Sequence, residues 1–112
     1  MPKFHIEIIK PSHYDNDGYV LQWWKAWIPS NSMACLYAIA QDSADRKILG
    51  EDVDVVVNAY DEMTMRLPLE RITRTIQAND NRGIVCLVGV QSNQYPRAMD
   101  IARTLRAQGI TV

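Results

Sequence analysis

The chain has 112 residues, of which 47% are hydrophobic and 22% are charged, and its net charge is −1. These values are typical of one globular domain spanning residues 1–112, and the near-neutral charge gives no indication of nucleic-acid or anionic-membrane binding. There is no run of about twenty apolar residues, and the N-terminal residues do not resemble a signal peptide. We therefore expect a cytoplasmic protein.

The two cysteines, Cys35 and Cys86, both lie inside apolar segments. We expect them to be small buried hydrophobic residues in a reducing compartment. They are too few for a zinc or iron–sulfur site formed by this chain alone.

The first half of the chain predicts a strand, a long loop and a helix. Phe4, Ile6 and Ile8 alternate with polar residues, which is typical of a strand that ends before Pro11. Residues 12–31 form a loop with a turn cluster at 15–18, and its segment 20–27 fits one or two helical turns. A helix is expected after Ser30 or Ser32 as N-cap, continuing with a break as far as Gly50. Its apolar stripe consists of Met33, Leu36, Tyr37 and Ala40.

The second half repeats this alternation. Residues 52–57 predict a second strand, residues 58–62 its exit, and Pro68 opens a helix whose inner face carries Leu69, Ile72 and Ile76. Turn residues 79–83 precede an unbroken apolar strand at 84–90, and a polar loop follows at 91–94. Pro96 then opens an amphipathic helix, Gly109 ends it, and residues 110–112 begin a fourth strand. The third helix has the apolar stripe Ala98, Ile101, Ala102 and Leu105.

The order β-α-β-α-β-α-β predicts a Rossmann-like, flavodoxin-like α/β domain with a doubly wound parallel sheet. Because a five-stranded sheet of this kind continues beyond a fourth strand, we expect the domain to be incomplete after that strand. The chain would then be part of a longer protein.

Ligands of open parallel sheets bind outside the carboxyl ends of the strands. The groups expected there are polar and mostly neutral: Ser12, His13, Asn58, Gln91, Ser92, Asn93 and Gln94. Such side chains suit hydrogen bonding to a large, amide-rich ligand better than acid–base catalysis.

Catalytic motifs are absent: there is no GxGxxG, no GxxxxGK[ST] and no GxSxG. Asp61 and Glu62 form either an exposed acidic turn, the favoured interpretation, or a pair of functional carboxylates. His5 is expected to be structural, and for His13 a satisfied or exposed histidine is favoured over a ligand role. The three tryptophans, within residues 23–27, allow three interpretations: core packing, an interface, or a wall for a flat ligand.

Two segments resemble the N-terminal cobalamin-binding domain of B12-dependent radical SAM enzymes. They are the run VGVQSNQYPRA at 88–98 and the run WWKAWIPSNS at 23–32. The resemblance implies that cobalamin binds at the carboxyl edge of the sheet. The residues that would contact it are Ser12, His13, Gln91, Ser92 and Asn93.

The same resemblance implies a downstream domain with a CxxxCxxC motif, a [4Fe–4S] cluster and S-adenosylmethionine, which would perform a radical methylation or rearrangement. This chain contains no CxxxCxxC. It also lacks the cobalt-ligating DxHxxG signature of classical cobalamin domains, because Pro11 and Asn16 flank His13 where that signature has aspartate and glycine. A cofactor-binding rather than a catalytic role is therefore expected.

The leading hypothesis is thus a cobalamin-binding module that works with a downstream radical SAM domain. The alternative is a small α/β interaction module whose tryptophan-rich loop binds a protein partner, with a homodimer as one form. The exposure of Trp23, Trp24 and Trp27 distinguishes the two hypotheses.

Overall fold

The computed structural model describes residues 2–23 and 30–112. Within these residues, strands and helices alternate along the chain. The elements are β1 (Lys3–Lys10), α1 (Asn31–Asp45), β2 (Asp54–Asp61), α2 (Leu69–Ala78), β3 (Gly83–Leu87) and α3 (Tyr95–Arg106). The α/β class is confirmed, and so is the predicted alternation as far as α3.

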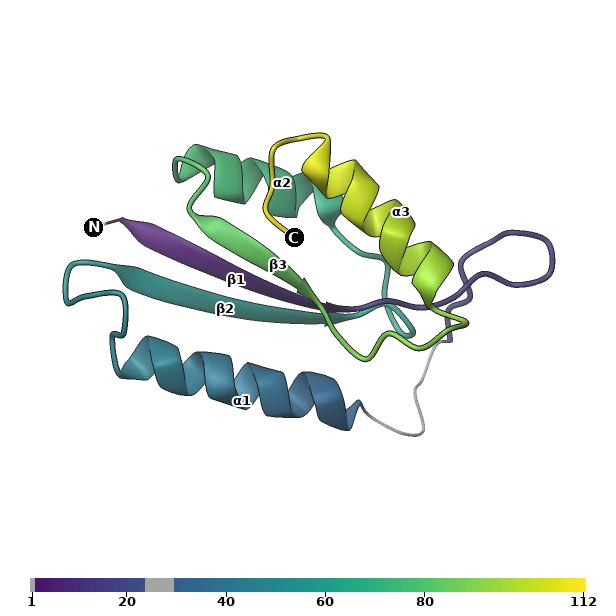
Figure 1. Ribbon diagram of the computed structural model, residues 1–112, viewed down its shortest axis with the longest axis horizontal. Coiled ribbons are helices and arrows are strands. Elements are labelled where there is room, and N and C mark those ends of the chain that lie inside the picture. The colour runs from purple at the N-terminus through teal and green to yellow at the C-terminus, as the bar shows by residue number, and fades with distance from the viewer. Residues whose placement is uncertain (1, 24–29) are drawn as a thin grey trace.

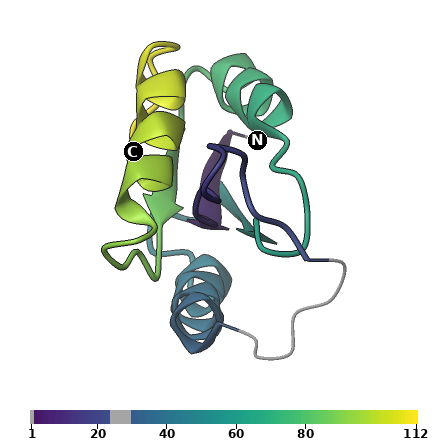
Figure 2. The same ribbon diagram turned by 90° about the vertical axis from the view of Figure 1, so that its right-hand side faces the viewer.

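The three strands form a parallel sheet in the order β2-β1-β3. Helix α1 covers one face, whereas α2 and α3 lie side by side on the other (Figures 1 and 2). The connection from β1 to β2 therefore crosses one face of the sheet, and the connection from β2 to β3 crosses the other face. The strand ends at Lys10, Asp61 and Leu87 gather at one edge of the sheet, which we call the carboxyl edge.

Each face of the sheet has its own hydrophobic core. Under α2 and α3 the core is built from Ile9, Leu67, Ile72, Ile76, Val85, Ile101, Leu105 and Ile110. Under α1 it is smaller, with Ile8, Val57 and Val88 buried and Met33, Ala40 and Ala44 packed against them. The inward stripes predicted for α2 and α3 are confirmed by the burial of Ile72, Ile76, Ala98, Ile101 and Leu105.

The polar residues of β1 are inside the protein. His5 and Glu7 alternate with Ile6 and Ile8, and both polar side chains are buried on the α2 face of the sheet. The register pairs Glu7 with Asn58 of β2. The alternation of polar and apolar residues in β1 therefore distinguishes two sides of the strand that are both inside the protein. It does not indicate that one side faces solvent.

Helix α1 differs from its prediction in length and burial. The Ser30 hydroxyl accepts a hydrogen bond from the Met33 N–H at 3.2 Å, which confirms this N-cap. The helix ends at Asp45, followed by a turn in which Lys47 has φ 52°. No α1 residue is fully buried, and Cys35 is exposed, which corrects the expectation of a buried cysteine. Cys86 is half-buried in β3.

Strand boundaries also shift. Strand β2 extends to Asp61, so Asn58 lies inside the strand and not at the carboxyl edge where it was predicted. Strand β3 ends at Leu87, and Gly89 then adopts φ 63° as the chain turns away. Residues 110–112 lie outside the three strands, although the Val85 N–H donates to the Thr111 carbonyl at 2.9 Å.

The loop after β1 contains an antiparallel bridge between Tyr14 and Val20. Residues 20–23 are not helical, which contradicts that part of the predicted helical turns, and the rest of that prediction lies outside the described residues. Trp23 is 54% exposed, whereas Trp24 and Trp27 lie outside the described residues. Among the described residues, no helix is long and apolar enough to cross a membrane.

Candidate functional site

The loops after β1 and β3 meet at the carboxyl edge, and one buried side chain joins them. The Gln94 side chain donates to the Pro11 carbonyl at 3.0 Å and accepts from the Gln91 N–H at 2.9 Å. Gln94 is 6% exposed. Because β1 and β3 leave the sheet in opposite directions of winding, the switch point of this sheet lies between their loops. Gln94 therefore fixes both sides of the crevice where an open α/β sheet binds its ligand.

The three side chains at positions 91–93 point to solvent beside this junction. Gln91, Ser92 and Asn93 are all exposed. The backbone beneath them is held by the Gln94 N–H, which donates to the Gln91 carbonyl at 3.0 Å and begins α3. The loop thus presents two amides and one hydroxyl on a fixed turn, and these side chains form no hydrogen bond with the residues that the structure describes.

Ser12, by contrast, is directed into the protein. It has no exposed surface. Its N–H donates to Glu62 at 3.1 Å, and its hydroxyl is hydrogen-bonded to the Leu21 carbonyl and lies 3.1 Å from the Met63 sulfur. The side chain that sequence reasoning assigned to ligand contact therefore connects the loops after β1 and β2.

The neighbouring residue His13 is half-buried, and its carbonyl accepts from the Leu21 N–H at 2.9 Å. The structure places His13 in the loop after β1, as the sequence predicts. Its backbone forms part of the hairpin that Tyr14 and Val20 close. Of the five residues expected to contact a ligand, the structure thus brings Gln91, Ser92 and Asn93 together at the surface and places Ser12 and His13 at least partly inside.

An ion pair that sequence reasoning did not identify lies behind the edge. Glu62 was interpreted as part of an exposed acidic turn, but it is 1% exposed. Its carboxylate accepts from Arg97 Nη2 at 2.6 Å and from Arg97 Nε at 3.0 Å. These hydrogen bonds raise the pKa of the Arg97 guanidinium above its ordinary value. A charge-assisted pair of this geometry joins the exit of β2 to the first turn of α3.

The hairpin after β1 is attached to the same helix. The Tyr14 hydroxyl is hydrogen-bonded to Asp100, and the Arg97 guanidinium lies over the Tyr14 ring, 5.9 Å from its centre. Burial raises the pKa of the Tyr14 phenol, and the hydrogen bond to Asp100 raises it further. The loops after all three strands are therefore bonded to one another or to α3.

A second polar group is buried in the centre of the sheet. Glu7 is 2% exposed, and its Oε1 accepts from the Asn58 amide at 3.3 Å. Its Oε2 and the Nδ1 of His5 have no hydrogen-bond partner among the described residues. Burial raises the pKa of Glu7, whereas the hydrogen bond from Asn58 opposes that rise. His5 is 6% exposed, in agreement with its predicted structural role.

The described residues hold no group of three or more histidine, cysteine, aspartate or glutamate side chains arranged to bind a metal ion. The loop 91–93 therefore offers neutral hydrogen bonding, the charged residues Lys10 and Asp61 end two strands at the same edge, and the Glu62–Arg97 ion pair lies behind it. Such an arrangement can orient a large neutral polar ligand, because the few polar groups that face the ligand lie on a rigid support.

Comparisons of this chain with family models, with curated proteins and with solved structures find no match.

Proposed function

We propose that this chain is a cobalamin-binding module of a radical SAM enzyme, in which cobalamin lies against the carboxyl edge of the sheet. The observation that carries the proposal is the exposed loop 91–93 at the switch point between β1 and β3. The resemblance of segments 23–32 and 88–98 to that family supports it. In this proposal the radical chemistry, with its [4Fe–4S] cluster and S-adenosylmethionine, belongs to a downstream domain.

The donor set at the edge fits the corrin rim. Corrin carries several amide side chains, and the amides of Gln91 and Asn93 can each donate to and accept from such groups. The hydroxyl of Ser92 adds a smaller contact in between. Ser12 supports the loop from inside and is not assigned a contact, because its hydrogen-bonding groups are already used within the protein. His13 remains a proposed contact, without a role as cobalt ligand.

The proposal includes a fourth strand formed by residues 110–112 beside β3. The supporting contact is the hydrogen bond from the Val85 N–H to the Thr111 carbonyl, at 2.9 Å. The side chain of Ile110 is 3% exposed and packs in the core under α2 and α3. A strand at this position extends the order to β2-β1-β3-β4, which is the flavodoxin-like arrangement with its switch point between β1 and β3.

Titration of the chain with hydroxocobalamin, followed by visible absorbance, tests the proposal. We expect a saturable spectral change that Gln91→Phe weakens by roughly tenfold or more, because a bulky ring replaces a hydrogen-bonding amide at the proposed contact. The matched control is Gln108→Phe, since Gln108 is also exposed and lies beyond α3, where its carbonyl accepts from Gln77 near the end of α2. Absence of any saturable change, or equal weakening by both variants, would contradict the proposal.

One observation favours the interaction module as a second candidate. Trp23 is 54% exposed and Tyr19 is 73% exposed in the loop after β1. Aromatic side chains of this kind are enriched at protein interfaces. For a homodimer through this loop, sedimentation velocity should show a concentration-dependent dimer that Trp23→Ser abolishes. A monomer at all concentrations would remove the homodimer form of this candidate.

A further inference from the structure

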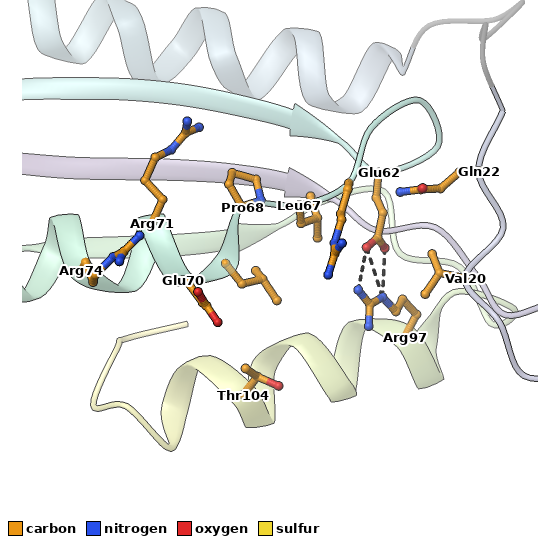
Figure 3. Close-up of a pocket in the computed structure, with 12 residues that line it drawn as sticks. Val20, Gln22, Glu62, Leu67, Pro68, Glu70, Arg71, Arg74, Arg97 and Thr104 are labelled. Carbon is orange, nitrogen blue, oxygen red and sulfur yellow. Dashed lines mark hydrogen bonds and ion pairs between the residues drawn. The ribbon is translucent and has the colours of Figure 1, made fainter.

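A second site lies on the flank of the molecule, apart from the loop 91–93. An open groove of about 860 Å³ runs between the start of α2 and the side of α3 (Figure 3). Residues 66–71 and Arg74 line it from the α2 side, and Arg97 and Thr104 line it from α3. We call it the α2–α3 groove. Its volume lies within the range of small-molecule sites, and no residue of the loop 91–93 contributes to it.

The groove carries an excess of positive charge. Its lining includes four arginines and two glutamates: Arg66, Arg71, Arg74, Arg97, Glu62 and Glu70. The charges of Glu62 and Arg97 cancel in their ion pair. None of the other three arginines forms an ion pair with a carboxylate in the described part of the chain. Arg71 is directed toward the strands, where its charge acts on Glu7. In the groove, Arg66 and Arg74 thus outnumber the single carboxylate of Glu70.

The first turn of α2 adds hydrogen-bond donors to the same wall. The N-cap residue is Pro68, and no side chain caps the helix there. The N–H groups of the first turn have no acceptor within the helix, and they carry its positive dipole end. Residues 68–71, which form this end, all line the groove. Guanidinium groups and an uncapped helix terminus together favour a ligand with several anionic oxygens.

The floor of the groove is apolar, and a smaller cavity continues from it along α2. Val20, Leu67 and Leu69 contribute apolar surface beside the arginines. The smaller cavity, of about 410 Å³, shares Leu69, Glu70, Arg74 and Thr104 with the groove and reaches Thr73, Gln77 and Gln108. At its far end the Gln77 amide donates to the Gln108 carbonyl at 3.0 Å. A ligand is thus offered charge from the arginines and apolar or neutral surface beside them.

We propose that the α2–α3 groove binds an organic phosphate monoester. A phosphate monoester carries about −1.5 to −2 charges at pH 7, so the excess of guanidinium charge in the groove favours it. Its phosphate lies at the start of α2 among these guanidinium groups, and its organic part lies on Leu67 and Leu69 toward Thr104. The site goes beyond the proposed cobalamin function, because it uses a different surface and a different ligand chemistry.

Adenosine monophosphate and inorganic phosphate are suitable probes, and amide chemical shifts of the ¹⁵N-labelled chain are a suitable readout. We expect saturable shifts for residues 69–71 and for Thr104 with adenosine monophosphate, and weaker binding of inorganic phosphate. The double variant Arg66→Gln/Arg74→Gln should weaken binding of adenosine monophosphate by about tenfold or more, because charged hydrogen bonds are lost.

The matched control is Arg82→Gln/Arg106→Gln, which removes the same charge from two exposed arginines outside the groove. It should bind adenosine monophosphate like the unmodified chain. The proposal is overturned if the shifts do not saturate, if both double variants weaken binding equally, or if inorganic phosphate binds as tightly as the nucleotide. The hydroxocobalamin titration should be unchanged by Arg66→Gln/Arg74→Gln, so the two proposals fail independently.

Discussion

Arg97 contacts Glu62 through two of its nitrogens, with Nη2 2.6 Å from Oε2 and Nε 3.0 Å from Oε1. The carboxylate side chain is 2% exposed and the guanidinium side chain is 19% exposed. Because Glu62 follows β2 and Arg97 begins α3, this pair fixes the helix that carries the loop 91–93 against the end of a strand that is not its sequence neighbour.

Removing Arg97 should lower the free energy of unfolding more than neutralising Glu62 does. In Arg97→Met the buried Glu62 keeps its charge without a partner, so the free energy of unfolding should fall by about 3 kcal/mol. In Glu62→Gln the side chain still accepts from the Ser12 N–H and the guanidinium turns to water, so the loss should be smaller. Urea denaturation of both variants measures the difference. Equal losses would contradict the assignment of Glu62 as the more deeply buried charge.

Glu7 predicts a dependence of stability on pH. Burial raises its pKa in the folded protein, so the folded state holds this proton more tightly than the unfolded state does. Ionisation of Glu7 therefore does not change the free energy of unfolding below the pKa that Glu7 has in the unfolded state. It lowers that free energy progressively as pH rises through the pKa that Glu7 has in the folded state.

The variant Glu7→Gln removes this effect. It should raise the free energy of unfolding at pH 8 by on the order of 1 kcal/mol, because the buried negative charge of the carboxylate is eliminated. Near pH 4 the gain should disappear. Thermal denaturation of both proteins across this pH range checks the prediction, with the exposed carboxylate of Glu51 changed to Gln as the control. A gain at pH 4 as large as that at pH 8 would show that ionisation of Glu7 is not its cause.

Gln94 should control protection of the loop at the switch point. In Gln94→Met the Pro11 carbonyl loses a donor and the Gln91 N–H loses its acceptor. We expect hydrogen exchange of the Gln91 amide to become faster, and the free energy of unfolding to fall by about 1–2 kcal/mol. The exposed neighbour gives a control: Gln91→Met should leave both quantities nearly unchanged, because only its backbone forms these bonds. Unchanged exchange in Gln94→Met would contradict the bridging role.

The two faces of the sheet should differ in their response to core substitutions. Ile72 of α2 is 1% exposed, so Ile72→Ala should cost about 2–4 kcal/mol through lost burial and the cavity left behind. Ile39 of α1 is 63% exposed, and Ile39→Ala should cost less than about 0.5 kcal/mol. Amides of α1 should also exchange faster than those of α2. Similar losses in both variants would indicate that α1 is covered in solution.

Sequence pattern alone determined the class of the fold. Strand and helix periods, the Ser30 cap and the inward stripes of α2 and α3 depend on local spacing, and the structure confirms them. The same reasoning located the loop 91–93 after β3, because a polar run that follows a buried strand has only one place to lie.

Only the tertiary structure decided which polar side chains face outward. Ser12, Glu62 and Gln94 are polar residues in loops, and they are of the same residue types as exposed loop residues. They are buried because partners from distant parts of the chain, 35 to 83 residues away, satisfy their hydrogen bonds. His5 and Glu7 are buried because the register places them beneath α2. The local spacing of polar and apolar residues carries no information on such long-range hydrogen bonds. The burial of a polar group depends on where its partner lies in the folded chain.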